Sequence, residues 1–279
     1  MTLSDMNIMT DLQDLGDYHY LSDEEEVDFI DKVKNHLDTL KSKPSQSIWN
    51  LAWQDVYEAG EKSPTYLNNS NMCLDGKQVC RWNQRYITTE NPLLEKQYHE
   101  TILANITKKY FTNLDCVVEF GCGTGHNLKT IQSLLPDIKV AGSDFTNSSL
   151  TILDSIGIEG FFFDMIKDSF DKIPQGLRTS SNIGVLTMGS MEQIGDEWNN
   201  FFNVVSELQP TVCAHVEPLV ELYDEKNPID DLAIQYHHGR GYLKGFLPFL
   251  QDNNLIHLCE RTTFGNCFNE GYMVVIWKP

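Results

Sequence analysis

Three glycines at alternate positions follow a short apolar run that carries an acid. The run is Cys116–Phe120, the acid is Glu119, and the glycines are Gly121, Gly123 and Gly125. Glycine lets a backbone approach a ligand closely, and the apolar spacing after the glycines predicts a helix, whose first N–H groups are free to bind. The stretch therefore predicts a strand, a tight turn and a helix around a nucleotide-type pocket.

The spacing of these glycines distinguishes between kinds of pocket. Dinucleotide-binding folds usually carry G-x-G-x-x-G, and phosphate loops carry Lys followed by Ser or Thr, whereas this chain has E-x-G-x-G-x-G. This pattern resembles motif I of the class I S-adenosylmethionine-dependent methyltransferases. The resemblance implies that the loop from Glu119 to Gly125 packs against the methionine and ribose parts of S-adenosylmethionine. A glycine-rich turn in another α/β protein is the alternative.

An acid also ends the second predicted strand. This strand covers residues 138–143, and Asp144 follows it, 23 positions after Gly121 (144 − 121). An acid about 20 residues beyond the glycines binds ribose hydroxyls in dinucleotide folds. The resemblance implies the same role for Asp144, with Phe145 in the same site. The alternative is a helix cap, since Asn147–Ser149 opens the next helix.

Two further strands end in residues of suitable type. Residues 159–163 form the third, and Asp164 and Met165 follow it. The resemblance implies that Asp164 faces the exocyclic amine of adenine and that Phe163 or Met165 packs on the ring. The fourth strand ends at Met188, and Glu192 follows in the segment that the family places beside the sulfonium.

Strands and helices alternate from about residue 113 onward, which predicts a parallel sheet. The last two strands, 255–263 and 271–277, have no helix between them and must pair antiparallel, as in the resembled family. We therefore expect an α/β fold, a Rossmann-like seven-stranded methyltransferase sheet with helices on both faces. The other strands are expected at 116–120, 138–143, 159–163, 181–188 and 211–217, and the helices at 125–135, 147–156 and 196–208.

Residues 1–112 are expected to form an arm and a helical cap over this methyltransferase domain at 113–279. Ser22 and Glu25 form a capping-box pattern at the start of one helix. A proline at its first turn marks another helix, from 92 to about 111.

A helix between these two carries a pair of tryptophans. It is expected from residue 45 or 47 to about 59, with Ile48 and Leu51 buried. Trp49 and Trp53 are four apart and can stack on one face. We favour core packing for them, with substrate binding by Trp53 as the alternative.

The segment from residue 63 to 86 is turn-rich and is expected to be irregular. Its end is rich in cationic and aromatic groups. In many small-molecule methyltransferases such a segment folds over the cofactor, so the resemblance implies that Arg85 or Arg81 binds the cofactor carboxylate and Tyr86 its methionine chain. A surface ion pair and a buried aromatic are the alternative.

The exit of the fifth strand is the expected substrate side, because ligands bind beyond the carboxyl ends of parallel strands. A long connection, at about 218–239, follows Glu217 and predicts a substrate-binding insertion. A hydroxyl acceptor needs a general base, for which the candidates are His237 and His238, with Glu217 orienting the base. Arg240 and Tyr242 are expected to bind substrate, together with Glu192 and Trp53. Helix capping or surface exposure is the alternative for the histidines.

The amino-acid composition disfavours several kinds of binding partner and binding site. The chain has 40 acidic and 21 basic residues, a net charge of −19, and no basic cluster, which disfavours nucleic acid. No apolar run reaches the roughly 20 residues that span a membrane, and no secretory signal is evident, so we expect a cytoplasmic protein. Its seven cysteines lack a paired C-x-x-C, so no metal site is expected.

These features lead to a functional hypothesis. We expect S-adenosylmethionine as cofactor, S-adenosylhomocysteine as product, and a methyl acceptor that is a small molecule reacting through oxygen or nitrogen. Residues 240–248 weakly resemble bacterial methyltransferases of sugars and secondary metabolites. A protein or peptide methyltransferase and a non-catalytic cofactor-binding regulator are alternatives. The sequence leaves open whether the chain forms a homodimer.

Overall fold

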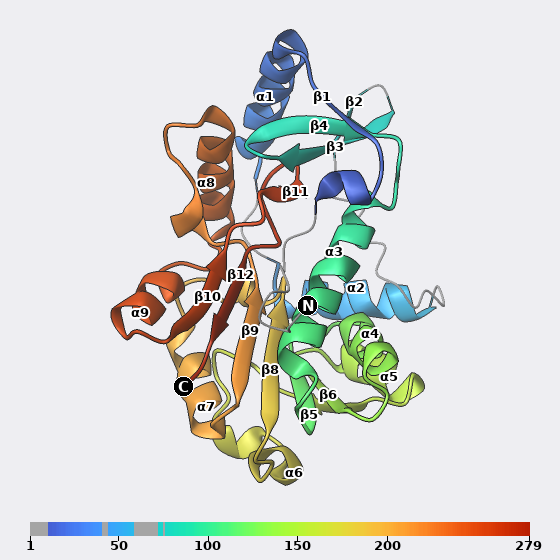
Figure 1. Cartoon of the computed structure of the whole chain (residues 1–279), viewed down its shortest axis with the longest axis vertical. Helices are drawn as coiled ribbons and strands as arrows, with labels where there is room; N and C mark the ends of the chain where they lie inside the picture. The colour runs from blue at the N-terminus through green and yellow to red at the C-terminus, as the bar shows by residue number, and fades with distance from the viewer. Residues whose placement is uncertain (1–10, 41–43, 59–71, 75) are drawn as a thin grey trace.

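A seven-stranded sheet organises the chain (Figure 1). The computed structural model describes residues 11–40, 44–58, 72–74 and 76–279. The strand order is β10-β12-β9-β8-β5-β6-β7, and β12 runs antiparallel to both of its neighbours. The predicted sheet, with its antiparallel final pair, is confirmed. Its strands are β5 (Cys116–Phe120), β6 (Lys139–Asp144), β7 (Glu159–Phe162), β8 (Ile183–Met188), β9 (Val212–Val216), β10 (Ile256–Glu260) and β12 (Val274–Trp277).

Helices cover both faces of this sheet, because neighbouring apolar side chains of its strands point to opposite sides. In β5, Val117 packs in one buried cluster with α3, α4 and α5, and Val118 packs in another with α6, α7 and α9. A π-helical segment, Thr107–Phe111, continues α3. These helices are α3 (Leu94–Ile106), α4 (His126–Leu134), α5 (Asn147–Ser155), α6 (Gln175–Arg178), α7 (Asn199–Leu208) and α9 (Phe246–Asp252).

A second, smaller sheet was not predicted. Its order is β1-β4-β3-β11, with β2 also paired to β3. A hairpin turn at Asn83 and Gln84, with φ of 50° and 60°, joins β3 to β4. The expectation of irregular structure is therefore wrong for residues 73–74 and 77–86, while 63–71 and 75 lie outside the described residues. The strands are β1 (Tyr18–Tyr20), β2 (Cys73–Leu74), β3 (Lys77–Trp82), β4 (Arg85–Thr89) and β11 (Phe264–Asn266).

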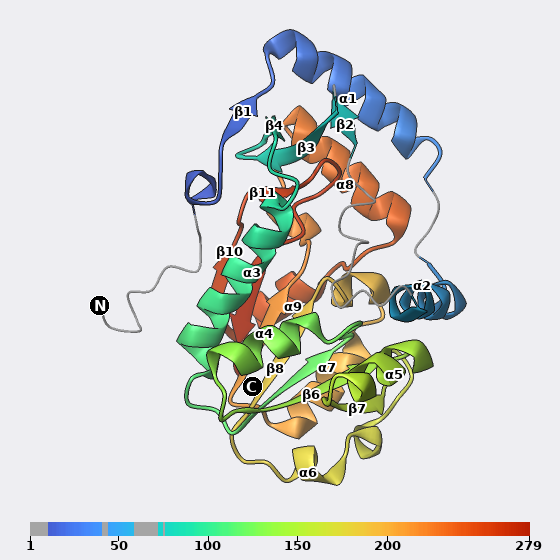
Figure 2. The same ribbon diagram turned by 90° about the vertical axis from the view of Figure 1, so that its right-hand side faces the viewer.

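Two helices lie against each other beside this second sheet (Figure 2). α1 (Asp23–Leu37) begins with the predicted capping box of Ser22 and Glu25. α8 (Pro228–Arg240) forms much of the connection at about 218–239, for which the sequence analysis predicted no helix. Asn227 caps α8 and proline follows it, a start signal that the sequence contained.

A buried ion network joins α8 to both sheets. Asp230, on α8, lies 2.7 Å from guanidinium nitrogens of Arg81 on β3 and of Arg261, which follows β10. Arg261 also pairs with buried Glu270 at 2.6 Å. Removing one member would leave buried charges uncompensated, which costs about 3–5 kcal/mol. The network therefore fixes the second sheet and α8 on the main sheet.

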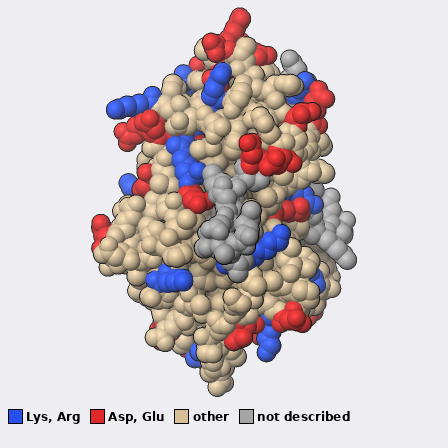
Figure 3. Space-filling model, viewed as in Figure 1, with Lys and Arg blue, Asp and Glu red and all other residues tan. Residues whose placement is uncertain are grey.

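The described residues lack two features. None of their helices is long and apolar enough to cross a membrane. They also contain no group of three His, Cys, Asp or Glu side chains arranged to hold a metal ion. On the face seen in Figure 3, acidic and basic side chains are interspersed.

Candidate cofactor and acceptor site

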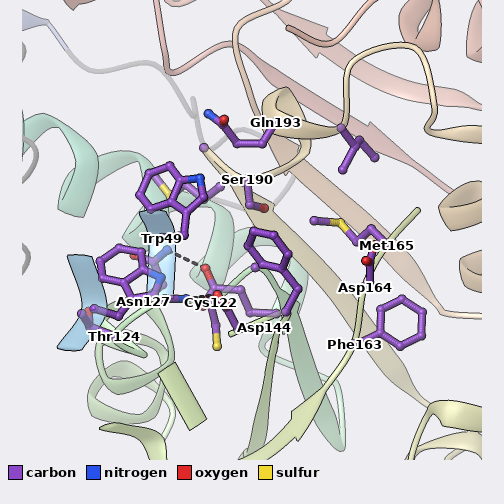
Figure 4. A pocket seen from close by; sticks show the side chains of 18 of the residues that line it. Trp49, Cys122, Thr124, Asn127, Asp144, Phe163, Asp164, Met165, Ser190 and Gln193 are labelled. Atoms are coloured by element: carbon purple, nitrogen blue, oxygen red, sulfur yellow. Dashed lines mark hydrogen bonds between the residues drawn. The ribbon is translucent and has the colours of Figure 1, made fainter. Parts of the chain in front are cut away.

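A cavity of about 260 Å³ lies at the carboxyl ends of β5, β6 and β8 (Figure 4). The carboxyl ends of parallel strands share one edge of a sheet, which brings residues from distant parts of the sequence together. The cavity is also bounded by α2 (Gln46–Glu58), α3 and the start of α4. Of the residues that we assigned to ligands, those that line it are Glu119, Gly121, Gly123, Asp144, Phe145, Asp164, Met165, Met188 and Trp53.

The glycine loop passes too close to its neighbours for other residues. Gly121 and Gly123 have φ of +72° and +51°. A Cβ atom on Gly121 would lie 2.4 Å from Cβ of Ser190, and one on Gly123 would lie 2.8 Å from the Trp53 ring. Gly125 is the N-cap of α4 and does not line the cavity, so it shapes the loop and not the wall.

Asp144 connects the loop to the end of β6. Its Oδ1 accepts hydrogen bonds from the backbone N–H of Thr146 at 2.9 Å and the Thr146 hydroxyl at 2.7 Å, and its Oδ2 accepts from Gly123 N–H at 3.1 Å. The helix-cap alternative does not hold for Asp144, because Thr146 caps α5. Burial raises the pKa of Asp144, whose carboxylate remains on the cavity wall.

Glu119 lines the cavity and keeps one carboxylate oxygen without a hydrogen-bond partner. Its Oε1 accepts a hydrogen bond from Asn127 Nδ2 at 2.7 Å, and Asn127 Oδ1 lies 2.7 Å from His99 Nε2. Because Asn127 donates through Nδ2, its oxygen faces His99, whose Nε2 carries the proton. Glu119 Oε2 is buried without a hydrogen-bond partner. Burial raises the pKa of Glu119 to about 8 and lowers that of His99 to about 4.

The residues that follow β7, Asp164 to Lys167, form one wall of the cavity, and Figure 4 shows Asp164 and Met165 in it. Asp164 Oδ1 accepts from the backbone N–H of Ile166 at 3.0 Å, and Oδ2 lies 2.9 Å from Lys167 Nζ. Phe163 is almost fully buried under this turn. Apolar side chains beside one carboxylate make this end suitable for a flat ring with an exocyclic donor.

α2 closes the cavity with aromatic rings. Trp49 and Trp53 stack with ring centroids 5.5 Å apart, and both line the cavity. Asn50 fixes α2 on α5, because its carbonyl oxygen accepts a hydrogen bond from Ser148 Oγ at 2.8 Å. Ile48 and Leu51 are 56% and 60% exposed, so the prediction that they are buried is wrong. The helix turns its tryptophan face, and not its aliphatic face, to the protein.

Glu217, a predicted catalytic residue, holds the loop after β8. It does not line the cavity. Its carboxylate accepts hydrogen bonds from three consecutive backbone N–H groups at 3.0–3.2 Å, those of Ser190, Met191 and Glu192. Burial is the main reason that its pKa rises to about 7. The structure therefore makes Glu217 a positioning residue for a segment that contributes Ser190 to the cavity.

The support of Glu217 continues into the core through His215. Thr187 donates to Glu217 and lies 2.8 Å from His215 Nδ1, and Trp277 Nε1 donates to His215 Nε2 at 2.8 Å. An indole N–H can only donate, so Nε2 is the acceptor and Nδ1 carries the proton of His215. Burial lowers the pKa of His215 to about 3, which keeps the ring neutral.

The predicted substrate residues Glu192, Arg240 and Tyr242 form a cluster next to the cavity without lining it. Arg240 Nε donates to Tyr242 Oη at 3.3 Å, and Tyr242 is hydrogen-bonded to Glu192. Burial, followed by the charge of Glu217, raises the pKa of Glu192 to about 8. The cluster reaches the cavity through Gln193, to which Glu192 is bonded.

The predicted bases His237 and His238 lie away from the cavity. Both are in the last turn of α8 and not before a helix. His237 is buried, its Nε2–H donates to the carbonyl oxygen of Leu243, and burial lowers its pKa to about 4. His238 is exposed. The prediction that one of them is a base at the cavity is not supported, because the connection is helical and places both histidines at the end of α8, outside the cavity.

Arg85 and Tyr86 are also outside the cavity. Arg85 lies on β4, 3.4 Å from Glu26, and Tyr86 Oη donates to the carbonyl oxygen of Cys267. This is the ion pair and buried aromatic that the sequence left as the alternative. The hairpin holds both in the second sheet. Among the described residues, the cations that line the cavity are instead Lys96 of α3 and Lys167.

Solved structures share this architecture. One is an S-adenosylmethionine-dependent methyltransferase from Anabaena variabilis, 12% identical, with a TM-score of 0.50 over 85% of this chain and 97% of that chain. Another is a candidate methyltransferase from Thermobifida fusca, 10% identical, with a TM-score of 0.50 over 68% and 81%. This chain has the class I methyltransferase fold. No family model and no curated protein matches the sequence.

Within the class I methyltransferase fold, several cavity residues escaped the sequence analysis. Lys96 and His99 are three positions apart and so share a face of α3. The apolar pattern on the other side of the same helix was the stronger signal, so these two polar residues were not singled out. Asn127 follows the last glycine by two positions, in the first turn of α4. These residues include Lys96, His99, Asn127, Lys167 and Gln193.

Proposed function

We propose that the chain is an S-adenosylmethionine-dependent methyltransferase that acts on an oxygen or nitrogen of a small molecule. The observation that carries the proposal is the cavity in which the unpaired Glu119 Oε2 lies with the carboxylates of Asp144 and Asp164. The cofactor presents an ammonium group, two ribose hydroxyls and an exocyclic amine, all hydrogen-bond donors. A wall of carboxylate acceptors at successive strand ends suits this ligand.

The residues present fit each part of the cofactor. Glu119 would hold the ammonium group, which supplies both a donor and a countercharge to a buried carboxylate. Asp144 would hold the ribose, and Asp164 the adenine amine. Lys96, whose Nζ lies 3.9 Å from Glu100, lines the cavity and is the cation suited to the methionine carboxylate, whereas Arg85 does not line the cavity.

The bound cofactor would supply a methyl group activated by a sulfonium. The chain must then position the acceptor in line and exclude water. Trp49 and Trp53 cover the glycine loop, and Glu217 fixes the segment after β8. His99 is a half-buried histidine of the cavity wall, and its lowered pKa makes it a weak base. We therefore favour an acceptor that needs no strong base, such as an unprotonated amine, which attacks through its lone pair and loses a proton after the transfer, or an acidic hydroxyl.

Calorimetry with S-adenosylhomocysteine tests cofactor recognition. No binding at near-millimolar ligand would contradict the proposal. Incubation with labelled S-adenosylmethionine and a cell extract then tests the reaction. Label in the small-molecule fraction supports it, label in macromolecules favours a protein or peptide methyltransferase, and full affinity without any labelled product favours a non-catalytic binding protein.

A further inference from the structure

Gln193 carries a second unpaired acceptor in the cavity. It lies on the turn Met191–Ile194 after β8, and its side chain lines the cavity. Its Oε1 is buried and has no hydrogen-bond partner. Figure 4 shows Gln193 beyond Ser190, at the end of the cavity opposite Asp144. Burying an acceptor without a partner is unfavourable, so a ligand donor at this atom would restore a lost interaction.

The amide nitrogen of Gln193 has a partner, and its oxygen does not. Gln193 Nε2 donates to Glu192 Oε1 at 2.7 Å. Glu192 is held in turn by Tyr242, whose hydroxyl accepts from Arg240. With Nε2 bonded to Glu192, Oε1 is the amide atom that is left without a hydrogen-bond partner.

The backbone that carries Gln193 is also fixed. Glu217 accepts hydrogen bonds from the backbone N–H groups of residues 190–192, which directly precede Gln193. Ser190 Oγ donates to the carbonyl oxygen of Phe120 at 2.8 Å. The turn is therefore joined to the end of β5, directly before the glycine loop. A side chain on so constrained a turn presents its oxygen at a defined place, as a recognition group must.

The donors of the cofactor have other partners in the proposed site. Glu119 takes the ammonium group, Asp144 the ribose hydroxyls and Asp164 the adenine amine. Gln193 Oε1 then remains without a partner after the cofactor has bound. This step rests on the proposed function.

We propose that Gln193 Oε1 is a subsite for an N–H or O–H group of the methyl acceptor. The acceptor is accordingly a hydroxyl compound or a primary or secondary amine that keeps a donor while bound. Ethers and tertiary amines lack the group that this oxygen requires. The adenine amine offers the same chemistry, so the experiment must separate the two sources.

The test uses the whole protein saturated with S-adenosylhomocysteine and two probes, phenol and its donor-free ether anisole, titrated by ligand-observed NMR. We expect wild type to prefer phenol by about fivefold to tenfold, the contribution of one hydrogen bond. Gln193→Met, which keeps the length of the side chain, should lose this preference and keep its affinity for S-adenosylhomocysteine. Gln251→Met, at an exposed position of α9, is the control and should behave as wild type.

Three results would overturn the proposal. The first is equal preference in wild type and Gln193→Met, and the second is no phenol binding to the loaded wild type. The third is a weaker affinity of Gln193→Met for S-adenosylhomocysteine but not for its deaminated analogue S-inosylhomocysteine, which would assign Gln193 to adenine. Failure of S-adenosylhomocysteine to bind wild type would instead refute the proposed function.

Discussion

Glu119 should release a proton when the cofactor product binds. Burial raises the pKa of its carboxyl to about 8, and its Oε2 has no partner in the cavity. At pH 7 a carboxyl with this pKa is about nine-tenths protonated. An ammonium group beside Oε2 favours the ionised form. Binding of S-adenosylhomocysteine at pH 7 should therefore release close to one proton.

Glu119→Gln isolates this effect, because it removes the charge at nearly constant volume. A hydrogen bond to a charged group contributes about 1.5–3 kcal/mol. At pH 7 the carboxyl of wild type must first be deprotonated, which costs about 1.4 kcal/mol and reduces the binding free energy that this hydrogen bond contributes. We expect the variant to bind more weakly by about 1.5–3 kcal/mol at pH 8.5, and by no more than about 1.5 kcal/mol at pH 7.

Titration calorimetry in buffers of different ionisation enthalpy measures the protons released. Wild type should show a clear dependence on the buffer and Glu119→Gln a much smaller one. Glu207→Gln, an exposed change of the same kind on α7, should match wild type. Equal proton release in wild type and Glu119→Gln, or equal affinity at pH 8.5, would refute the role of this carboxylate.

Three further outcomes are expected. The pKa of Glu119 is higher in the folded than in the unfolded state, so its ionisation increasingly opposes folding as the pH rises from the unfolded to the folded pKa. Between pH 5 and pH 8, the free energy of unfolding of Glu119→Gln should therefore rise by up to about 3 kcal/mol relative to wild type, as measured by denaturant unfolding of the free protein. Asp144→Ala should weaken S-adenosylhomocysteine binding by about 1–3 kcal/mol in calorimetry, and unchanged affinity would move the ribose site elsewhere; Asp154→Ala, exposed on α5, is its control. Nitrogen NMR should find His215 neutral, with its proton on Nδ1, from pH 5 to pH 8, and an Nε2 proton would contradict the hydrogen-bond chain from Trp277.

The sheet and its strand ends were predictable because their signals are local. The apolar run before Gly121, the acid at Asp144 and the alternation of strands with helices each depend on a few neighbouring residues. Parallel strands place their carboxyl ends at one edge, so Glu119, Asp144 and Asp164 could be expected in one place before any contact was known.

Other features depended on the pairing of distant segments. The hairpin of β3 and β4 draws Arg85 into the second sheet, and β11, more than 170 residues later, completes that sheet. The helical form of α8 carries His237 into the core. In each case a short pattern was compatible with two environments, and packing against a remote element selected one of them.

The sequence by itself determined where the glycine loop and the strand-end acids lie, because backbone freedom and hydrophobic period are properties of neighbouring residues. Only the tertiary structure decided that Trp49 and His99 face the cavity, and that Glu217 supports a loop while Gln193 keeps a free oxygen. Hydrogen-bond partners and buried faces depend on which elements pack together in three dimensions, and this packing cannot be read from their separation along the chain.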